Sequence, residues 1–158
     1  MTAVEEIIGL GHRWEDQVAS ALEAQGFQVT YYGQRVTDQR TQDIVRQFHP
    51  HLAHVPDLLA INTYGEPIAI DAKWTSRTDT GLHDVNNLAR EGLADFATHY
   101  GALGLFAFNH DNDRLGFMNV ASWQHNSPRP GPMTSNGTGK PYQLVKCACW
   151  FPDWPRPG

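Results

Sequence analysis

The sequence predicts an α/β fold in which a mixed central β-sheet is flanked by helices. Two apolar runs at 57–74 are joined by four residues and read as a hairpin. A helical pattern then separates this hairpin from a further apolar run at 104–109. Because a helix between two neighbouring strands implies a parallel crossover, antiparallel and parallel pairs must share one sheet.

The composition is that of a globular protein. Of 158 residues, 41% are hydrophobic and 18% are charged, and no apolar run approaches the ~20 residues of a membrane span. The first residues carry acids where a signal peptide carries basic residues, so we expect a cytoplasmic protein with no membrane partner. The net charge of −5 argues against tight, metal-free coating of nucleic acid, but it leaves room for an acidic metal site.

The N-terminal region predicts a helix followed by a strand. Residues 5–25 repeat apolar side chains at helical spacing, and Gly26 is a typical helix stop. Residues 27–32 are rich in β-branched and aromatic side chains, which favours a first strand ending at Gly33. The polar segment 34–55 has only a short helix near 40–48, and we expect it to cover the site or face the substrate.

The middle of the chain predicts the rest of the sheet. The hairpin strands are 57–62 and 67–74, with a turn at 63–66. A second helix is expected over 84–100, capped by Asp84, and the runs 104–109 and 114–120 read as paired strands.

The C-terminal region differs in composition. Seven of the ten prolines follow Ser127. We therefore expect a core at 1–126 and, at 127–158, a Pro/Gly-rich extension that adds one strand in PYQLVKCACW and packs on the same domain. Cys147 and Cys149 are expected to be small strand residues, because no second cysteine pair exists for a metal.

The hairpin brings two acids together. If its turn is centred at 64–65, Asp57 lies opposite Asp71 and Ala72, and strand alternation places Lys73 on the face of Asp71. Two neighbouring carboxylates among apolar residues repel each other and require a cation. Mg²⁺ fits, since it takes one or two carboxylates plus waters and phosphate oxygens, and Lys73 adds a compact positive charge.

A third acid comes from the first helix. Glu15 lies on the largely apolar face that includes Val18 and Leu22, so it is expected to point inward. An inward carboxylate needs a partner, which a metal held at Asp57 and Asp71 would provide.

The order GHRWE, VPDLLAI and IAIDAKW resembles the PD-(D/E)xK nuclease superfamily, with Glu15, Pro56-Asp57 and Asp71-Ala72-Lys73 as the signature. The opening helix ending in GFQV also resembles Holliday-junction resolvases and restriction-type nucleases. The resemblance covers roughly 11–109 and implies a four-stranded mixed sheet between helices. Some branches carry Gln and Tyr on the following helix, where this chain has Asn87, Glu91 and Tyr100.

The resemblance implies a deoxyribonuclease that uses Mg²⁺ or Mn²⁺ to hydrolyse phosphodiester bonds. Its catalytic residues would be Glu15, Asp57, Asp71 and Lys73, and its metal ligands Glu15, Asp57, Asp71 and Ala72. An endonuclease on duplex or branched DNA is expected, and a resolvase would act as a homodimer. The rival function is a non-catalytic nuclease-fold module that binds nucleic acid or protein. A metal-dependent hydrolase of another substrate is a third hypothesis.

Several further residues are candidates for contact with DNA. The set comprises one histidine, three arginines and one tryptophan: His12, Arg13, Arg35, Arg77 and Trp74. Ordinary surface charge is the simpler interpretation of each arginine, and core packing is the simpler interpretation of Trp74. Three histidines, at positions 49, 51 and 54, suggest zinc only weakly, because the loop has no cysteine.

Overall fold

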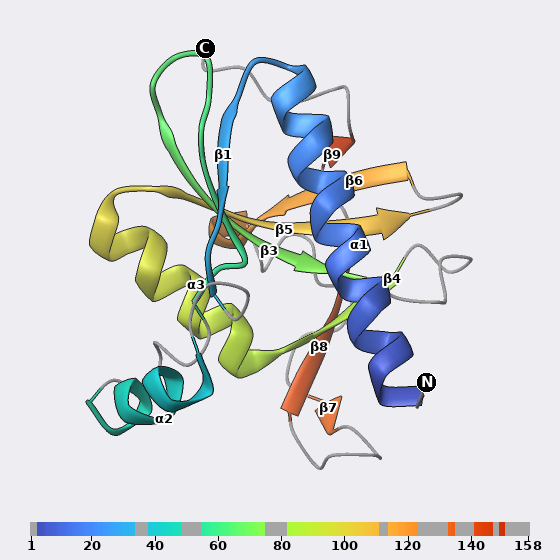
Figure 1. The fold of residues 1–158 in the computed structure, drawn as a ribbon, viewed down its shortest axis with the longest axis vertical. Helices are drawn as coiled ribbons and strands as arrows, with labels where there is room; N and C mark the ends of the chain where they lie inside the picture. The colour runs from blue at the N-terminus through green and yellow to red at the C-terminus, as the bar shows by residue number, and fades with distance from the viewer. Residues whose placement is uncertain are drawn as a thin grey trace.

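The computed structural model describes residues 3–33, 38–48, 55–74, 82–110, 114–122, 133–134, 141–146 and 149–150. Its main sheet has six strands in the order β1-β2-β3-β5-β6-β9, and a smaller sheet has the order β4-β8-β7 (Figure 1). In the main sheet only β3 and β5 are parallel, and the other pairs are antiparallel. The predicted mixed sheet is therefore confirmed.

The first helix and strand form as the sequence predicts. Helix α1 spans Ala3–Ala24 and strand β1 spans Gln28–Tyr31. Gly26 adopts φ 88°, a left-handed conformation that a glycine enters without steric cost. The N–H of Phe27 then donates to the carbonyl of Leu22, which ends the helix and directs the chain into β1.

The central hairpin consists of β2 (Leu58–Ile61) and β3 (Pro67–Lys73). Asn62 organises the turn, because its Oδ1 accepts hydrogen bonds from the N–H groups of Tyr64 and Glu66. Paired residues have numbers that sum to 128, as in Leu58 with Ile70, one less than the expected 129. Asp57 is therefore opposite Asp71 rather than between Asp71 and Ala72.

The second helix begins later than the sequence predicts. Residues Leu82–Asn86 form strand β4, and helix α3 spans Asn87–Tyr100. Asp84 is therefore a strand residue and no helix cap. Val85 pairs with Gln143, a residue far along the chain, and that long-range pairing overrides the helical pattern around it. Two large side chains of the expected helix, those of Leu88 and Tyr100, are exposed, although their helical spacing with Leu93 and Phe96 predicts a buried face.

The last part of the chain supplies more strands than expected. Strands β5 (Leu103–His110) and β6 (Arg114–Asn119) pair as predicted, and a short 3₁₀ helix, η3, follows at Val120–Ser122. Instead of one late strand there are β7 (Met133–Thr134), β8 (Pro141–Lys146) and β9 (Cys149–Trp150). Strand β8 pairs with β4, whereas β9 pairs with β6. The segment PYQLVKCACW is thus divided between two sheets.

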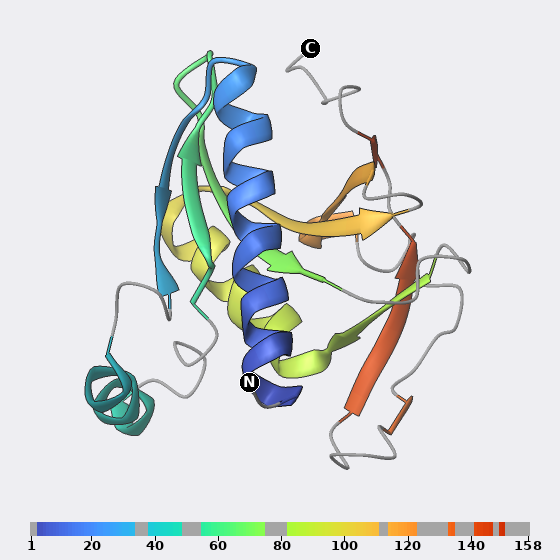
Figure 2. The ribbon, with the colours of Figure 1, turned by 45° about the vertical axis from the view of Figure 1, so that its right-hand side comes forward.

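Two apolar layers lie on opposite faces of the main sheet. Along β3, Ile68 and Ile70 pack in the cluster that contains Trp14, Val18 and Leu22 of α1. Ala69, between the two isoleucines, belongs to a second cluster with Ala89 and Leu93 of α3. Helices α1 and α3 therefore cover opposite faces, as strand alternation requires (Figure 2).

Helix α2 (Gln39–Phe48) lies between β1 and β2 in the sequence and stands apart from the two layers (Figures 1 and 2). Asp38 caps it, because its Oδ1 accepts the N–H of Thr41 at 2.7 Å. Of the described helices, none is long and apolar enough to cross a membrane.

The packing around Gly104 predicts a stability effect. A Cβ added there would lie 2.8 Å from Val120 Cγ1 and 3.1 Å from Ala97 Cβ. We expect Gly104→Ala to lower the free energy of unfolding by about 1–3 kcal/mol, since overpacking must displace a rigid neighbour. Gly9→Ala is the matched control, because nothing lies within 4 Å of its new Cβ. It should stabilise helix α1 by up to about 1 kcal/mol. Urea unfolding measures both, and equal effects of the two variants would contradict the packing argument.

Candidate active site

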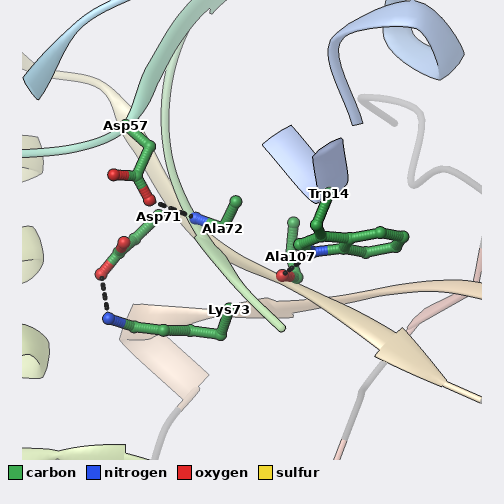
Figure 3. A network of polar contacts seen from close by, with 6 residues as sticks. All are labelled: Trp14, Asp57, Asp71, Ala72, Lys73 and Ala107. Carbon is green, nitrogen blue, oxygen red and sulfur yellow. Dashed lines mark hydrogen bonds and ion pairs between the residues drawn. The ribbon is translucent and has the colours of Figure 1, made fainter. Parts of the chain in front are cut away.

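Asp57 and Asp71 face each other at the end of the central hairpin. Asp57 immediately precedes β2, and its carbonyl accepts the N–H of Tyr32 at 2.8 Å, which ties it to the end of β1. Its Oδ2 accepts the N–H of Ala72 at 2.8 Å. The two carboxyl groups lie near each other, with that of Asp57 against the Ala72 N–H and that of Asp71 turned toward Lys73 (Figure 3), and hydrogen bonding with Asp71 is one cause of the raised pKa of Asp57. The hairpin register thus brings both acids into direct contact.

Lys73 completes this group. Its Nζ lies 3.2 Å from Asp71 Oδ2. Ala69, Asp71 and Lys73 occupy alternate positions of β3. The side chains of Asp71 and Lys73 therefore point to the face of the sheet that α3 covers. Asp71 is only 8% exposed, whereas the Lys73 side chain is 36% exposed. A buried carboxylate is therefore linked to a lysine side chain that is partly exposed.

The electrostatics of the group show an excess of negative charge. Burial raises the pKa of Asp57 to about 10, and the charge of Asp71, the hydrogen bond with it and the charge of Glu15 act in the same direction. Lys73 opposes this effect but does not overcome it. The charge of Asp71 also raises the pKa of Lys73, with a smaller contribution from Asp57. Without a cation, Asp57 therefore keeps its proton rather than adding a further negative charge to this group.

Helix α1 brings the third acid. Trp14 is buried and donates its indole N–H to the carbonyl of Ala107 at 3.1 Å, which fixes the helix against β5. The next residue, Glu15, is 9% exposed, as its apolar helix face predicts. Figure 3 shows Trp14 on one side of β3 and the Asp57, Asp71 and Lys73 side chains on the other. Glu15 therefore approaches from a different layer of the fold.

The donor set fits a hard divalent cation through its two aspartates. Mg²⁺ commonly uses one or two protein carboxylates and completes its coordination with waters and phosphate oxygens. Within the described residues, no three His, Cys, Asp or Glu side chains lie close enough to hold a metal. Glu15 contributes to the field at Asp57, but its role as a third ligand stays a prediction. At Ala72 the backbone N–H is already used by Asp57.

The residues proposed for DNA contact are placed differently from one another. His12 and Arg13 are exposed on α1, beside the buried Glu15. Trp74 is half-buried and packs against the α1-side cluster, and base stacking by it stays a prediction. Arg35, Arg77 and the three histidines at 49, 51 and 54 lie outside the described residues.

Sequence reasoning did not anticipate the role of Gly33 and Pro56 in positioning Asp57. Gly33 has φ 64°, and a Cβ there would lie 3.0 Å from the Pro56 carbonyl oxygen and 3.6 Å from Asp57 Cα. A side chain would push this strand end away from the acid pair. The available signal was the glycine directly after an apolar strand.

Comparison of the whole fold identifies a similar known protein. The Holliday junction resolvase Hjc from the archaeal hyperthermophile Archaeoglobus fulgidus matches with a TM-score of 0.55 and 16% identity, covering 86% of this chain and 83% of that one. The chain has a restriction-endonuclease-like fold. This likeness confirms the predicted fold class.

A second similar structure is D212, a nuclease from a fusselovirus, with a TM-score of 0.44 and 14% identity over 95% of this chain and 87% of that one. No family model and no curated protein sequence matches the chain. The restriction-endonuclease-like fold is here extended beyond the expected four strands by β6 and β9, and by the separate sheet of β4, β7 and β8.

The contact between the acids predicts how stability depends on pH. Asp57 ionises near pH 3.8 in the unfolded chain but keeps its proton up to about pH 10 in the metal-free folded protein. Between these values the folded state binds more protons, so this group makes stability fall as pH rises. We expect Asp57→Asn to unfold at a higher temperature than the wild type at pH 8 in EDTA, with a weaker decline from pH 5 to 8. The asparagine Oδ1 still accepts the Ala72 N–H.

Thermal unfolding followed by circular dichroism across this pH range measures the effect. Asp43→Asn is the matched control, because it makes the same change at an exposed acid on α2, outside the acid pair. A steeper decline in Asp57→Asn than in the wild type would contradict the electrostatic description of the acid pair.

Proposed function

We propose that this protein is a metal-dependent nuclease that hydrolyses DNA phosphodiester bonds, acting as an endonuclease on duplex or branched DNA. The observation that carries the proposal is the contact of Asp57, Asp71 and Lys73 at the end of one hairpin. The restriction-endonuclease-like fold, shared with a Holliday junction resolvase, supports the same function.

Each residue of the group has a distinct role in this proposal. Asp57 and Asp71 hold a divalent cation, either Mg²⁺ or Mn²⁺, with Glu15 as the third acid and the Ala72 backbone beside it. The Ala72 N–H keeps the Asp57 carboxylate oriented. Lys73, held against Asp71 and half-exposed, contacts the phosphate and stabilises the negative charge that develops on it during attack by water.

A divalent cation supplies two things at such a site: it acidifies water and it neutralises charge on the phosphodiester. The protein contributes burial and fixed geometry. Asp71 is shielded from solvent and Trp14 anchors the helix that carries Glu15, so the carboxylates are held in place before substrate arrives.

A non-catalytic module that binds nucleic acid or a protein partner is the alternative function. Such a module has no need to keep a lysine beside two touching carboxylates, an arrangement that costs folding energy without a cation. The presence of both acids and of Lys73 in contact favours the enzyme.

Cleavage tests the proposal directly. Labelled linear duplex, single-stranded, flap and four-way-junction DNA are incubated with the protein in Mg²⁺ or Mn²⁺. We expect the wild type to cut duplex or branched DNA, and Lys73→Ala to reduce the rate by roughly 10²–10³-fold, the usual effect of removing a charge-stabilising group. Excess EDTA should abolish cleavage by the wild type.

Lys146→Ala serves as the matched control, since Lys146 lies at the end of β8 and is not part of the proposed site. It should cut at the wild-type rate. Thermal unfolding with millimolar Mg²⁺ provides a second readout, because a metal that binds only the folded state raises the transition temperature. A folded protein that cuts none of the substrates and shows no metal shift would favour the binding module.

We also propose that the active form is a homodimer. Helix α3 leaves one side of β1 and β2 uncovered, and a groove of about 660 Å³ lies there. It is lined by apolar and aromatic residues, among them the exposed Tyr32, Ile61 and Tyr100. Tyr32 is also bonded to Asp57 through its backbone. Two copies joined symmetrically at this groove would bring two sites to one branched substrate.

Substitution in the groove tests the dimer. We expect Ile61→Lys to shift the protein from dimer to monomer. A symmetric interface would bury one lysine from each subunit, and burying two unpaired charges destabilises the dimer. Tyr64→Lys is the control, since Tyr64 is also exposed, at the hairpin turn, but lies outside the groove. Sedimentation velocity at micromolar concentration measures the mass. A monomeric wild type, or a dimer unaffected by Ile61→Lys, would contradict this assembly.

A further inference from the structure

Helix α2 has an apolar side that nothing described in the structure covers. Among its described side chains none is buried, and Ile44 and Phe48 are 50% and 76% exposed. The helix has ten residues, fewer than an isolated helix needs to be stable in water. Its capping by Asp38 contributes locally, but an apolar side chain as exposed as Phe48 indicates a surface that is covered in a complex.

The exposed residues of α2 form one stripe. Arg40, Ile44 and Phe48 are four residues apart, so they lie above one another on the same side of the helix. All three are exposed. The stripe therefore combines one cation with two apolar side chains, the second of them aromatic.

The charge of this segment is opposite to that of the whole protein. Residues 34–55 contain three arginines and three histidines against two aspartates, in a chain of net charge −5. Both aspartates are already engaged: Asp38 caps the helix, and Asp43 accepts the side-chain N–H of Gln39 at 2.8 Å. The sequence of this segment thus carries more basic than acidic side chains, and Arg40 is exposed on the described helix.

The segment starts and ends at the proposed active site. It follows Gly33 and returns at Pro56, and these two residues are in contact beside Asp57. The Tyr32 N–H bond to the Asp57 carbonyl closes the same junction. Helix α2 is therefore attached next to the acid pair, and it projects from the body of the protein at that end of β1 (Figures 1 and 2).

We propose that α2 binds DNA at positions where bases are unstacked, inserting Ile44 and Phe48 between or against these bases while Arg40 contacts phosphate. The proposal rests on the nuclease function proposed above and extends it to the form of the substrate. Apolar side chains that enter a base step are a known way to hold distorted DNA, and aromatic rings stack on any exposed base. A branch point supplies unstacked bases, whereas a regular duplex does not. The basic excess of the segment favours an anionic partner over a neutral or basic one, and its attachment beside the acid pair makes DNA that partner.

Binding to DNA in the Lys73→Ala background tests the proposal without cleavage. Ile44→Ser/Phe48→Ser is compared with the parent by fluorescence anisotropy on a four-way junction and on linear duplex. We expect about tenfold or greater loss of affinity for the junction and little change for the duplex, since stacking on a base contributes about 1–3 kcal/mol. The fluorescence of a 2-aminopurine base at the branch should change on binding of the parent protein and change less with the variant.

The matched control is Tyr64→Ser/Leu88→Ser, which removes one aromatic and one aliphatic side chain of similar exposure from the hairpin turn and α3. It should bind the junction like the parent. Circular dichroism checks that both double variants remain folded. The expected pattern in binding and in 2-aminopurine fluorescence supports the α2 proposal.

Three outcomes would overturn it. Equal junction affinity and equal 2-aminopurine response in parent and variant mean that α2 does not meet the bases. Conversion of a dimer to a monomer by Ile44→Ser/Phe48→Ser means that α2 is a subunit contact. If the wild type neither binds nor cuts any DNA, both the proposed nuclease function and the α2 proposal are wrong. If the wild type cuts DNA and the α2 substitutions do not change the cleavage, only the α2 proposal is wrong.

Discussion

Two carboxyl groups in contact are the constraint around which this structure is organised. The register of the β2–β3 hairpin leaves Asp57 opposite Asp71, and burial there opposes ionisation of Asp57. The surrounding contacts hold the pair together: the Ala72 N–H binds Asp57, Lys73 binds Asp71, and the Tyr32 N–H ties Asp57 to β1. An arrangement with this electrostatic cost is expected where a cation and a phosphate are to be bound.

The layers of the fold determine how the remaining groups reach this pair. Helix α1 and helix α3 cover opposite faces of the main sheet, and the two clusters separate at β3, where alternate residues point to alternate faces. The side chains of Asp71 and Lys73 point to the face that α3 covers, whereas Glu15 belongs to α1, which packs on the other face. Glu15 therefore approaches the acid pair from the opposite layer of the fold. This explains why Glu15 influences Asp57 electrostatically without joining a three-residue ligand cluster in the part of the chain described.

The additions to the core give the chain its individual surfaces. The apolar groove over β1 and β2 lies on one side of the junction formed by Tyr32 and Asp57, and α2 is attached at the same junction through Gly33 and Pro56. An assembly surface and a substrate-contacting helix would thus both be connected to the acid pair. The second sheet, which joins β4 to β8, lies on the path from β3 to α3 and ties the C-terminal region to the core.

The sequence by itself determined the local features of this protein. The acid pair and Lys73 were predictable, because a four-residue turn fixes a hairpin and alternation then fixes which side chains meet. The first helix, its glycine stop and the inward face of Glu15 followed from periodicity in the same way. Only the tertiary structure decided the features that depend on distant partners. Val85 is a strand residue because Gln143 pairs with it, and Trp14 is anchored by a carbonyl 93 residues away. Local patterns contain no information about such pairings, because the partner becomes a neighbour only when the chain folds.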